Sequence, residues 1–264
     1  MDFRIQNRIA IVCGGSAGLG FAAARALSSE GVRVAICGRT LATLEKAAET
    51  IHAETGCEVL PVVADVSKPE DCEALVKRVE AELGTVDILI NNSGGPTPGL
   101  FDNKGDGEWA EGVEATLMNV VRMIRLVLPG MKQKGWGRIL SITSSSVKEP
   151  VGSLLLSNSI RPAVHGLTKS LSVELGADGI TINTIQPGYF LTERLEEVAK
   201  ANAEKKNWST EEELKALASS TPVRRLGKPK EFGEAIAFLC SEQAAYITGT
   251  TLLVDGGRTA GTSY

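Results

Sequence analysis

The segment that most constrains the fold is the glycine-rich turn at residues 13–20, whose sequence is CGGSAGLG. A short apolar run at 9–12 precedes the turn, and a helix-forming run that begins at Phe21 follows it. A strand, a glycine turn and a helix N-terminus in this order are typical of a site that holds a pyrophosphate. The spacing is G-x-x-x-G-x-G rather than G-x-G-x-x-G, so a plain glycine-rich turn is the alternative interpretation of this segment alone.

Strand and helix patterns alternate along the whole chain. Apolar runs predict strands at 9–12, 32–37, 59–66, 86–90, 138–143, 180–185 and 251–254. Helical patterns include 41–52, 106–134 and 153–177, and Ser67 with Glu70 forms a capping-box pattern that predicts a helix running to Leu83. The sequence therefore predicts one α/β domain over residues 1–264, a Rossmann-type doubly wound sheet of about seven parallel strands flanked by helices.

Residues 192–222 interrupt this alternation, because they are polar, charged and helix-prone with few large apolar side chains. A solvated pair of helices is one interpretation of the segment. The other interpretation is a lid, because long insertions beside a ligand site often close over it. We expect a helical, lid-like insertion at about 189–222.

Composition excludes several classes of protein. A net charge of -4 argues against a nucleic-acid partner, and neither a signal-peptide pattern nor an apolar run of about 18 residues is present. The five cysteines are scattered without a C-x-x-C pair, which indicates free thiols in a reducing compartment, and the two histidines do not stand at metal-ligand spacing from them. We expect a cytoplasmic protein without a metal site or a membrane partner.

Several motifs resemble those of the short-chain dehydrogenase/reductase family, in that family's order, over residues 5–257. Besides the glycine turn they are Asp65-Val66, NNSG at 91–94, Ser144, GLTKSLSVEL at 166–175, ITINTIQPG at 180–188, RRLGKPKEF at 224–232 and ITGTTLLVDGG at 247–257. Within the family the chain is most similar to the bacterial 3-oxoacyl-(acyl-carrier-protein) reductases. The resemblance implies hydride transfer between a nicotinamide and a small-molecule carbonyl or alcohol. It also implies a homodimer or homotetramer paired through the helices at 106–134 and 153–177.

The resemblance also implies which residues bind the cofactor. Residues of the glycine turn would hold the pyrophosphate, namely Gly14, Ser16, Gly18, Leu19 and Gly20. The adenine would lie against Asp65 and Val66, and the adenosine side of the crevice against Asn91, Ser93 and Gly94. The nicotinamide carboxamide and adjacent phosphate would meet Pro187, Gly188 and Thr192. The positive charge of Arg161 would either bind the nicotinamide ribose or polarise an oxyanion.

The end of the second strand bears on the choice between NAD and NADP. An acidic residue there would bind the 2′-hydroxyl of NAD and repel a 2′-phosphate. This chain has Gly38-Arg39-Thr40 instead, and an arginine can form paired hydrogen bonds to a phosphate. NADP(H) is therefore favoured over NAD(H), the alternative being that Arg39 is only a solvated surface residue.

The catalytic positions depart from the family's pattern. Counting back from GLTKSLSVEL, the Tyr-x-x-x-Lys pair of the family would occupy positions that hold Ser157 and Arg161, while the relay asparagine would fall at Thr116. Ser144 alone keeps its expected identity. A serine hydroxyl is a far weaker acid than a phenol, and an arginine does not shuttle protons at ordinary pH. Three substitutes are open: a water ordered by Ser144, Ser157 and Arg161, or Lys148, or Tyr189.

Two functions from different classes follow. The favoured one is an NADP(H)-dependent oxidoreductase of the carbonyl reductase or alcohol dehydrogenase type with an atypical proton donor, a 3-oxoacyl thioester being one possible substrate. Ser144, Ser157 and Arg161 are its candidate catalytic residues. The alternative is a dinucleotide-binding protein without redox turnover, serving as a regulator or an assembly subunit.

Overall fold

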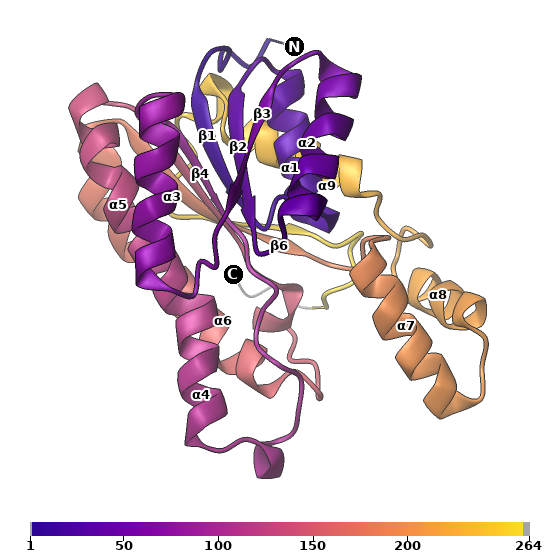
Figure 1. Ribbon diagram of the computed structural model, residues 1–264. Helices are drawn as coiled ribbons and strands as arrows, with labels where there is room; N and C mark the ends of the chain where they lie inside the picture. Colours follow the sequence, from indigo (N-terminus) through magenta and orange to yellow (C-terminus); the bar gives the residue numbers. More distant parts are fainter. Residues whose placement is uncertain (1, 261–264) are drawn as a thin grey trace.

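The computed structural model, which describes residues 2–260, contains one sheet of seven parallel strands in the order β3-β2-β1-β4-β5-β6-β7 (Figure 1). The strands are β1 (Ile9–Cys13), β2 (Arg33–Gly38), β3 (Val59–Val63), β4 (Ile88–Asn91), β5 (Gly137–Ile142), β6 (Ile180–Pro187) and β7 (Thr251–Val254). The strand order reverses at β1, which pairs with β2 on one side and β4 on the other. Such a reversal opens a crevice at the carboxyl ends of the strands. The predicted Rossmann-type sheet is confirmed.

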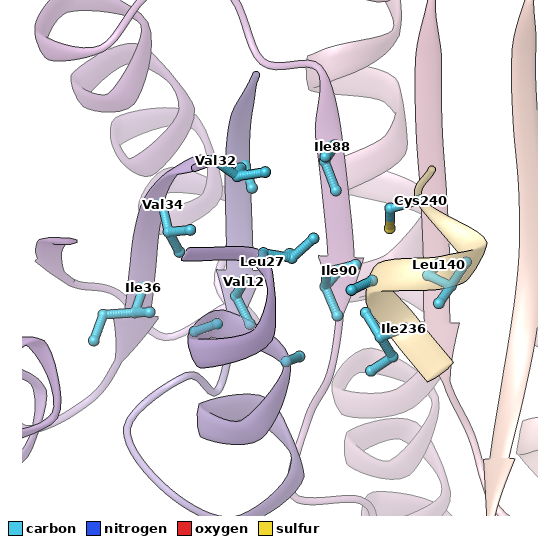
Figure 2. Packing of buried hydrophobic residues seen from close by; sticks show 14 of the residues in the cluster. Val12, Leu27, Val32, Val34, Ile36, Ile88, Ile90, Leu140, Ile236 and Cys240 are labelled. Carbon is cyan, nitrogen blue, oxygen red and sulfur yellow. The ribbon is translucent and has the colours of Figure 1, made fainter. Parts of the chain in front are cut away.

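Helices cover both faces of this sheet (Figure 1). One layer consists of α1 (Gly18–Ser29), α2 (Leu41–Thr55) and α9 (Pro229–Leu239). The other consists of α3 (Pro69–Glu82), α5 (Asn119–Lys134) and α6 (Leu155–Leu175), while α4 (Asp106–Val113) extends beyond the sheet and packs against α6 (Figure 1). Figure 2 shows the first layer, where Leu27 of α1 and Ile236 of α9 belong to the same buried cluster as Val12, Ile90 and Leu140 of the strands. Successive strand side chains point to opposite faces, so Ile11 belongs to the other core.

The helical region 106–134 is divided rather than continuous. A π-helical segment, Glu114–Met118, separates α4 from α5. Each π turn holds one residue more than an α turn can, which changes the direction of the side chains that follow. The hydroxyl of Thr116 lies in this segment, and it is buried without a hydrogen-bond partner among the described residues.

Two predictions around residue 65 are wrong. Strand β3 ends at Val63 rather than at 66, and α3 begins at Pro69 without a side-chain cap. Proline suits the first helical position, because its fixed φ matches the helix and its missing N–H group would have no partner there. Ser67 does not form the predicted capping box, since its hydroxyl donates to Asp65 Oδ1 at 2.7 Å.

The polar segment after β6 folds into two helices, α7 (Glu193–Lys206) and α8 (Thr210–Ser219), which lie side by side away from the sheet (Figure 1). Thr192 caps α7 by accepting from the Leu195 N–H at 3.2 Å, and Ser209 forms a capping box with Glu212. Lys206 and the buried Glu213 join the two helices through an ion pair of 2.7 Å. No helix within residues 2–260 is long and apolar enough to cross a membrane.

Candidate active site

A cavity of about 380 Å³ lies where β1, β2 and β4 end. Seven of the predicted cofactor-binding residues line it: Gly14, Ser16, Arg39, Asp65, Val66, Ser93 and Gly94. These residues come from four separate segments of the chain, which the reversal of strand order brings to one crevice.

The glycine turn fits the approach of a pyrophosphate. Gly14 and Gly18 have φ values of 58° and 57°, a conformation that glycine adopts without strain. A Cβ on Gly20 would lie 2.1 Å from the Gly14 carbonyl oxygen, so this position packs the helix against the turn. No side chain within residues 2–260 caps the N-terminus of α1, which leaves its N–H groups for an anion. The side chain of Asn92 stabilises the turn, because its Nδ2 donates to the Gly14 carbonyl at 3.3 Å.

Arg39 and Asp65 face this cavity from adjoining strand ends. Arg39 is exposed directly after β2 and has no ion-pair partner in the part of the chain that the structure describes. Asp65 accepts from the hydroxyl and the backbone N–H of Ser67, and the hydroxyl bond is the main cause that lowers the pKa of Asp65. The cavity therefore presents one carboxylate and one unpaired guanidinium.

A second cavity, of about 580 Å³, adjoins the first because Gly94 and Gly95 line both. It brings together the three candidate catalytic residues, Ser144 after β5 and Ser157 and Arg161 on α6. Pro187 and Gly188 at the end of β6 line the same cavity, as do residues of α7. We call it the substrate cavity.

Ser157 and Arg161 form a hydrogen-bonded pair one helical turn apart. Arg161 Nε donates to Ser157 Oγ at 3.0 Å, and Nη1 donates to the carbonyls of Thr143 and Ile142 at 3.0 and 3.3 Å. No carboxylate within residues 2–260 lies within 4 Å of this guanidinium. Burial lowers the pKa of Arg161 to about 10, so it is still cationic at neutral pH.

Ser144 Oγ accepts from the Ser146 N–H at 3.1 Å, and this bond fixes the serine at the start of the loop after β5. Its own hydroxyl hydrogen is left to donate elsewhere. Ser146 Oγ in turn lies 3.4 Å from Ser157 Oγ, so the two serine-bearing segments meet at the cavity wall.

A small cavity of about 10 Å³ lies behind Arg161, and Thr116, Asn119 and Asn91 line it. Asn119 is engaged within its own helix, because Nδ2 donates to the Ala115 carbonyl at 3.0 Å and Oδ1 accepts from the Val120 N–H at 2.6 Å. Thr116, by contrast, lines this cavity with a hydroxyl that has no hydrogen-bond partner among the described residues.

Several predicted residues lie outside the two large cavities. Gly18, Leu19 and Gly20 form the first turn of α1, Thr192 caps α7, and Asn91 donates to Ser141 Oγ at 3.4 Å beneath the crevice. Lys148 does not line the substrate cavity within the described residues, whereas Tyr189 does.

His165 is packed rather than exposed to substrate. Its Nε2 lies 3.1 Å from Thr143 Oγ1, and its Nδ1 lies 2.9 Å from Thr251 Oγ1. Burial is the main cause that lowers its pKa to about 4, with a smaller contribution from the positive charges of Lys148 and Arg161.

Sequence reasoning does not identify Arg258, which lines the substrate cavity beside Ser144. The signal available was its place directly after the Asp-Gly-Gly motif at 255–257. Its guanidinium lies 4.6 Å from the centroid of the Tyr189 ring.

A family model described as enoyl-(acyl carrier protein) reductase matches residues 14–259. The chain belongs to the short-chain dehydrogenase/reductase family. Among its relatives in this family, nodulation protein G of Azospirillum brasilense is 35% identical over 256 residues, and 3-oxoacyl-(acyl-carrier-protein) reductase FabG of Haemophilus influenzae is 36% identical over 255. Each match covers 96% of this chain and 98% of the relative.

L-sorbose reductase from Gluconobacter frateurii, solved in complex with NADPH and L-sorbose, superposes with a TM-score of 0.95 at 31% identity. That match covers 99% of this chain and 100% of the reductase. Membership of the short-chain dehydrogenase/reductase family makes the protein an oxidoreductase of carbonyl and hydroxyl groups that uses a nicotinamide dinucleotide.

Proposed function

We propose that this protein is an NADP(H)-dependent reductase that interconverts a small-molecule carbonyl and its alcohol, with a 3-oxoacyl thioester as one candidate substrate. The observation that carries the proposal is the junction at Gly94 and Gly95, where the cavity of the glycine turn meets the cavity of Ser144 and Ser157. The relatives named as 3-oxoacyl reductases and the solved NADPH complex support this substrate and cofactor class.

The residues present fit a dinucleotide. The uncapped N-terminus of α1 and the backbone of Gly14 would receive the pyrophosphate, and Asp65 would lie beside the adenine. Arg39, without an ion-pair partner in the described chain, would bind the 2′-phosphate, which favours NADP(H). The bound cofactor would supply the hydride in the reduction and accept it in the reverse reaction.

Ser157 and Arg161 would act together on the substrate oxygen. The Arg161 Nε–H donates to Ser157 Oγ, so the serine hydroxyl hydrogen is left to donate either to Ser146 Oγ, 3.4 Å away, or to that oxygen. Ser144 supplies a second hydroxyl donor on the same cavity wall. The guanidinium charge stabilises the alkoxide that develops as the carbonyl is reduced, and solvent supplies the proton that completes the alcohol. Of the three substitute donors, Lys148 does not line the substrate cavity within the described residues, while Tyr189 lines it together with the residues that would hold a water.

The alternative is a dinucleotide-binding protein without turnover. It is supported by Ser157 and Arg161, which replace the tyrosine and lysine of the family's catalytic pair. A screen of NADPH oxidation with ketones, 3-oxoacyl thioesters and sugars separates the two functions. We expect turnover that Ser144→Ala lowers at least about 100-fold, since a donor aimed at the reacting oxygen is worth about that much. Ser29→Ala, at the exposed C-terminal end of α1, is the matched control. NADPH binding without oxidation of any substrate would favour the alternative.

The Ser157→Tyr, Arg161→Lys double variant tests whether the pair is a working site. If Ser157 and Arg161 support catalysis as proposed, the double change lowers the native reductase activity, because the tyrosine ring fills space that the substrate uses. A rise in activity would mean that the wild-type site is impaired.

We infer that the protein acts in the cytoplasm as a homodimer or homotetramer. Val173 on α6 has 81% of its surface exposed in the single chain, and all five cysteines are free thiols. A single exposed valine is ordinary on a protein surface, so the inference rests on the family resemblance, in which the helices at 106–134 and 153–177 pair subunits. Light scattering on the purified protein measures the assembly directly, and a monomer would overturn this part of the proposal.

A further inference from the structure

The geometry points to Arg258 as an oxyanion-binding residue of the substrate cavity, so that the substrate is a carbonyl compound carrying a carboxylate or a phosphate. This inference rests on the proposed function and names its substrate class. The ligand chemistry, an oxyanion held by a guanidinium, is shared by a keto acid and by a coenzyme A thioester.

A tight turn after β7 places Arg258 in the cavity wall. Asp255 Oδ1 accepts from the Gly257 N–H at 2.9 Å, and Oδ2 accepts from the Thr259 N–H at 2.7 Å. Gly256 and Gly257 have φ values of 66° and 79°, which lets the chain reverse direction within these residues. The residue that follows therefore lies beside the carboxyl end of β6, where the substrate cavity opens.

The guanidinium of Arg258 is held in place but not saturated. Its side chain has 17% of its surface exposed and stacks on Tyr189. Its ion-pair partner within residues 2–260 is Glu149, whose Oε2 lies 3.9 Å from Nη1, too far for a hydrogen bond. That carboxylate oxygen is buried and accepts no hydrogen bond from the described residues. Arginine has five N–H donors. Neither the stacking on Tyr189 nor the long ion pair with Glu149 uses one of them, so they can bind a ligand.

Arg122 is an arginine of the same exposure that, unlike Arg258, has a carboxylate and a carbonyl within hydrogen-bonding distance. Its side chain is also 17% exposed, but Nη2 lies 2.6 Å from Glu114 Oε2 and Nη1 donates to the Ser67 carbonyl at 3.4 Å. Arg122 lines neither of the two large cavities. The difference between the two arginines is therefore one of position and partners rather than of burial.

The charge of the substrate cavity also favours an anion. Among the described residues, four cationic side chains and one carboxylate line it: Arg161, Arg194, Lys205, Arg258 and Glu197. Arg194 is paired with Glu197 at 3.4 Å, which leaves Lys205 at the exposed rim and the two half-buried arginines, Arg161 and Arg258. Apolar side chains such as Leu154, Val198 and Leu217 line the same space. A substrate in which an apolar spacer separates the carbonyl from an oxyanion would fit this combination of cationic and apolar side chains.

The test compares anionic carbonyl compounds with neutral partners that carry the same oxoacyl group. The pairs are acetoacetate, 4-oxopentanoate and 5-oxohexanoate with their methyl esters, and acetoacetyl-coenzyme A with its N-acetylcysteamine thioester. Dissociation constants are measured by the fluorescence of NADPH bound to the intact protein, and KM and kcat are measured where turnover occurs. We expect Arg258→Gln to weaken binding of the matching anion about 10- to 100-fold, as for the loss of a charged hydrogen bond, and to change binding of its neutral partner less than about twofold.

Arg122→Gln is the matched control and leaves both members of each pair unchanged. Arg258→Lys keeps the charge without the paired donors, and we expect it to bind the anion more tightly than Arg258→Gln does. If Arg258→Gln does not fold, Arg258→Lys still tests the role of the paired donors. Anion binding that depends on Arg258 in a protein without turnover would support this inference while the proposed function fails. The inference would be overturned if Arg258→Gln changed the dissociation constants of the anion and of its neutral partner by the same factor. It would also be overturned if no anion bound to the NADPH-loaded protein. The pair that responds distinguishes a carboxylate from a coenzyme A phosphate.

Discussion

Arg39 follows β2 and lines the cavity of the glycine turn, where we propose that it binds the 2′-phosphate of NADP(H). We expect Arg39→Ala to raise the dissociation constant of NADPH about 10- to 100-fold, because a guanidinium–phosphate contact contributes about 1.5–3 kcal/mol. The dissociation constant of NADH, which lacks the 2′-phosphate, should change less than about twofold. Isothermal titration calorimetry measures both.

Arg33→Ala is the control for this change, since Arg33 begins the same strand at its opposite end and donates to the Leu83 carbonyl at 2.9 Å. Equal losses for NADPH and NADH in Arg39→Ala would show that the arginine acts on the fold of the crevice rather than on the 2′-phosphate.

At the scale of elements, His165 joins α6 to the ends of β5 and β7 through Thr143 and Thr251. Its pKa is lowered from 6.5 to about 4, so between these values the unfolded chain binds a proton that the folded protein does not. Stability therefore falls as the pH is lowered through this window. We expect the free energy of unfolding in urea to decrease from pH 7 to pH 5, with a smaller decrease in His165→Gln.

His52→Gln is the matched control, because His52 is the other histidine of the chain and is exposed on α2. It should keep the wild-type pH dependence. If His165→Gln also keeps that dependence, burial of His165 does not contribute to acid sensitivity.

The order of elements was predictable from the sequence because apolar runs and glycine turns are local signals of strands and turns. Local signals failed where tertiary contacts decide. Ser67 has the capping pattern, but Asp65 takes its hydroxyl, and Pro69 sets the start of α3. Likewise the π-helical segment at 114–118 breaks a pattern that reads as one helix. The role proposed for Arg258 depends on the reversal of the chain at 255–257. The Asp-Gly-Gly motif indicates a turn there, but it does not indicate which cavity the next side chain lines.

At the scale of the whole molecule, the two halves of the crevice belong to one sheet. Strand β1 pairs with both β2 and β4, so the parts of the sheet that carry the cavity of the glycine turn and the substrate cavity share a strand and the helix layers on either face. We expect one cooperative unfolding transition in calorimetry, which tests the prediction of a single domain over residues 1–264. NADPH at 100 times its dissociation constant should stabilise the folded state by about 2.7 kcal/mol and shift that transition as a unit. Two transitions, of which NADPH shifts only one, would show that the halves unfold separately and that the shared strand does not couple them.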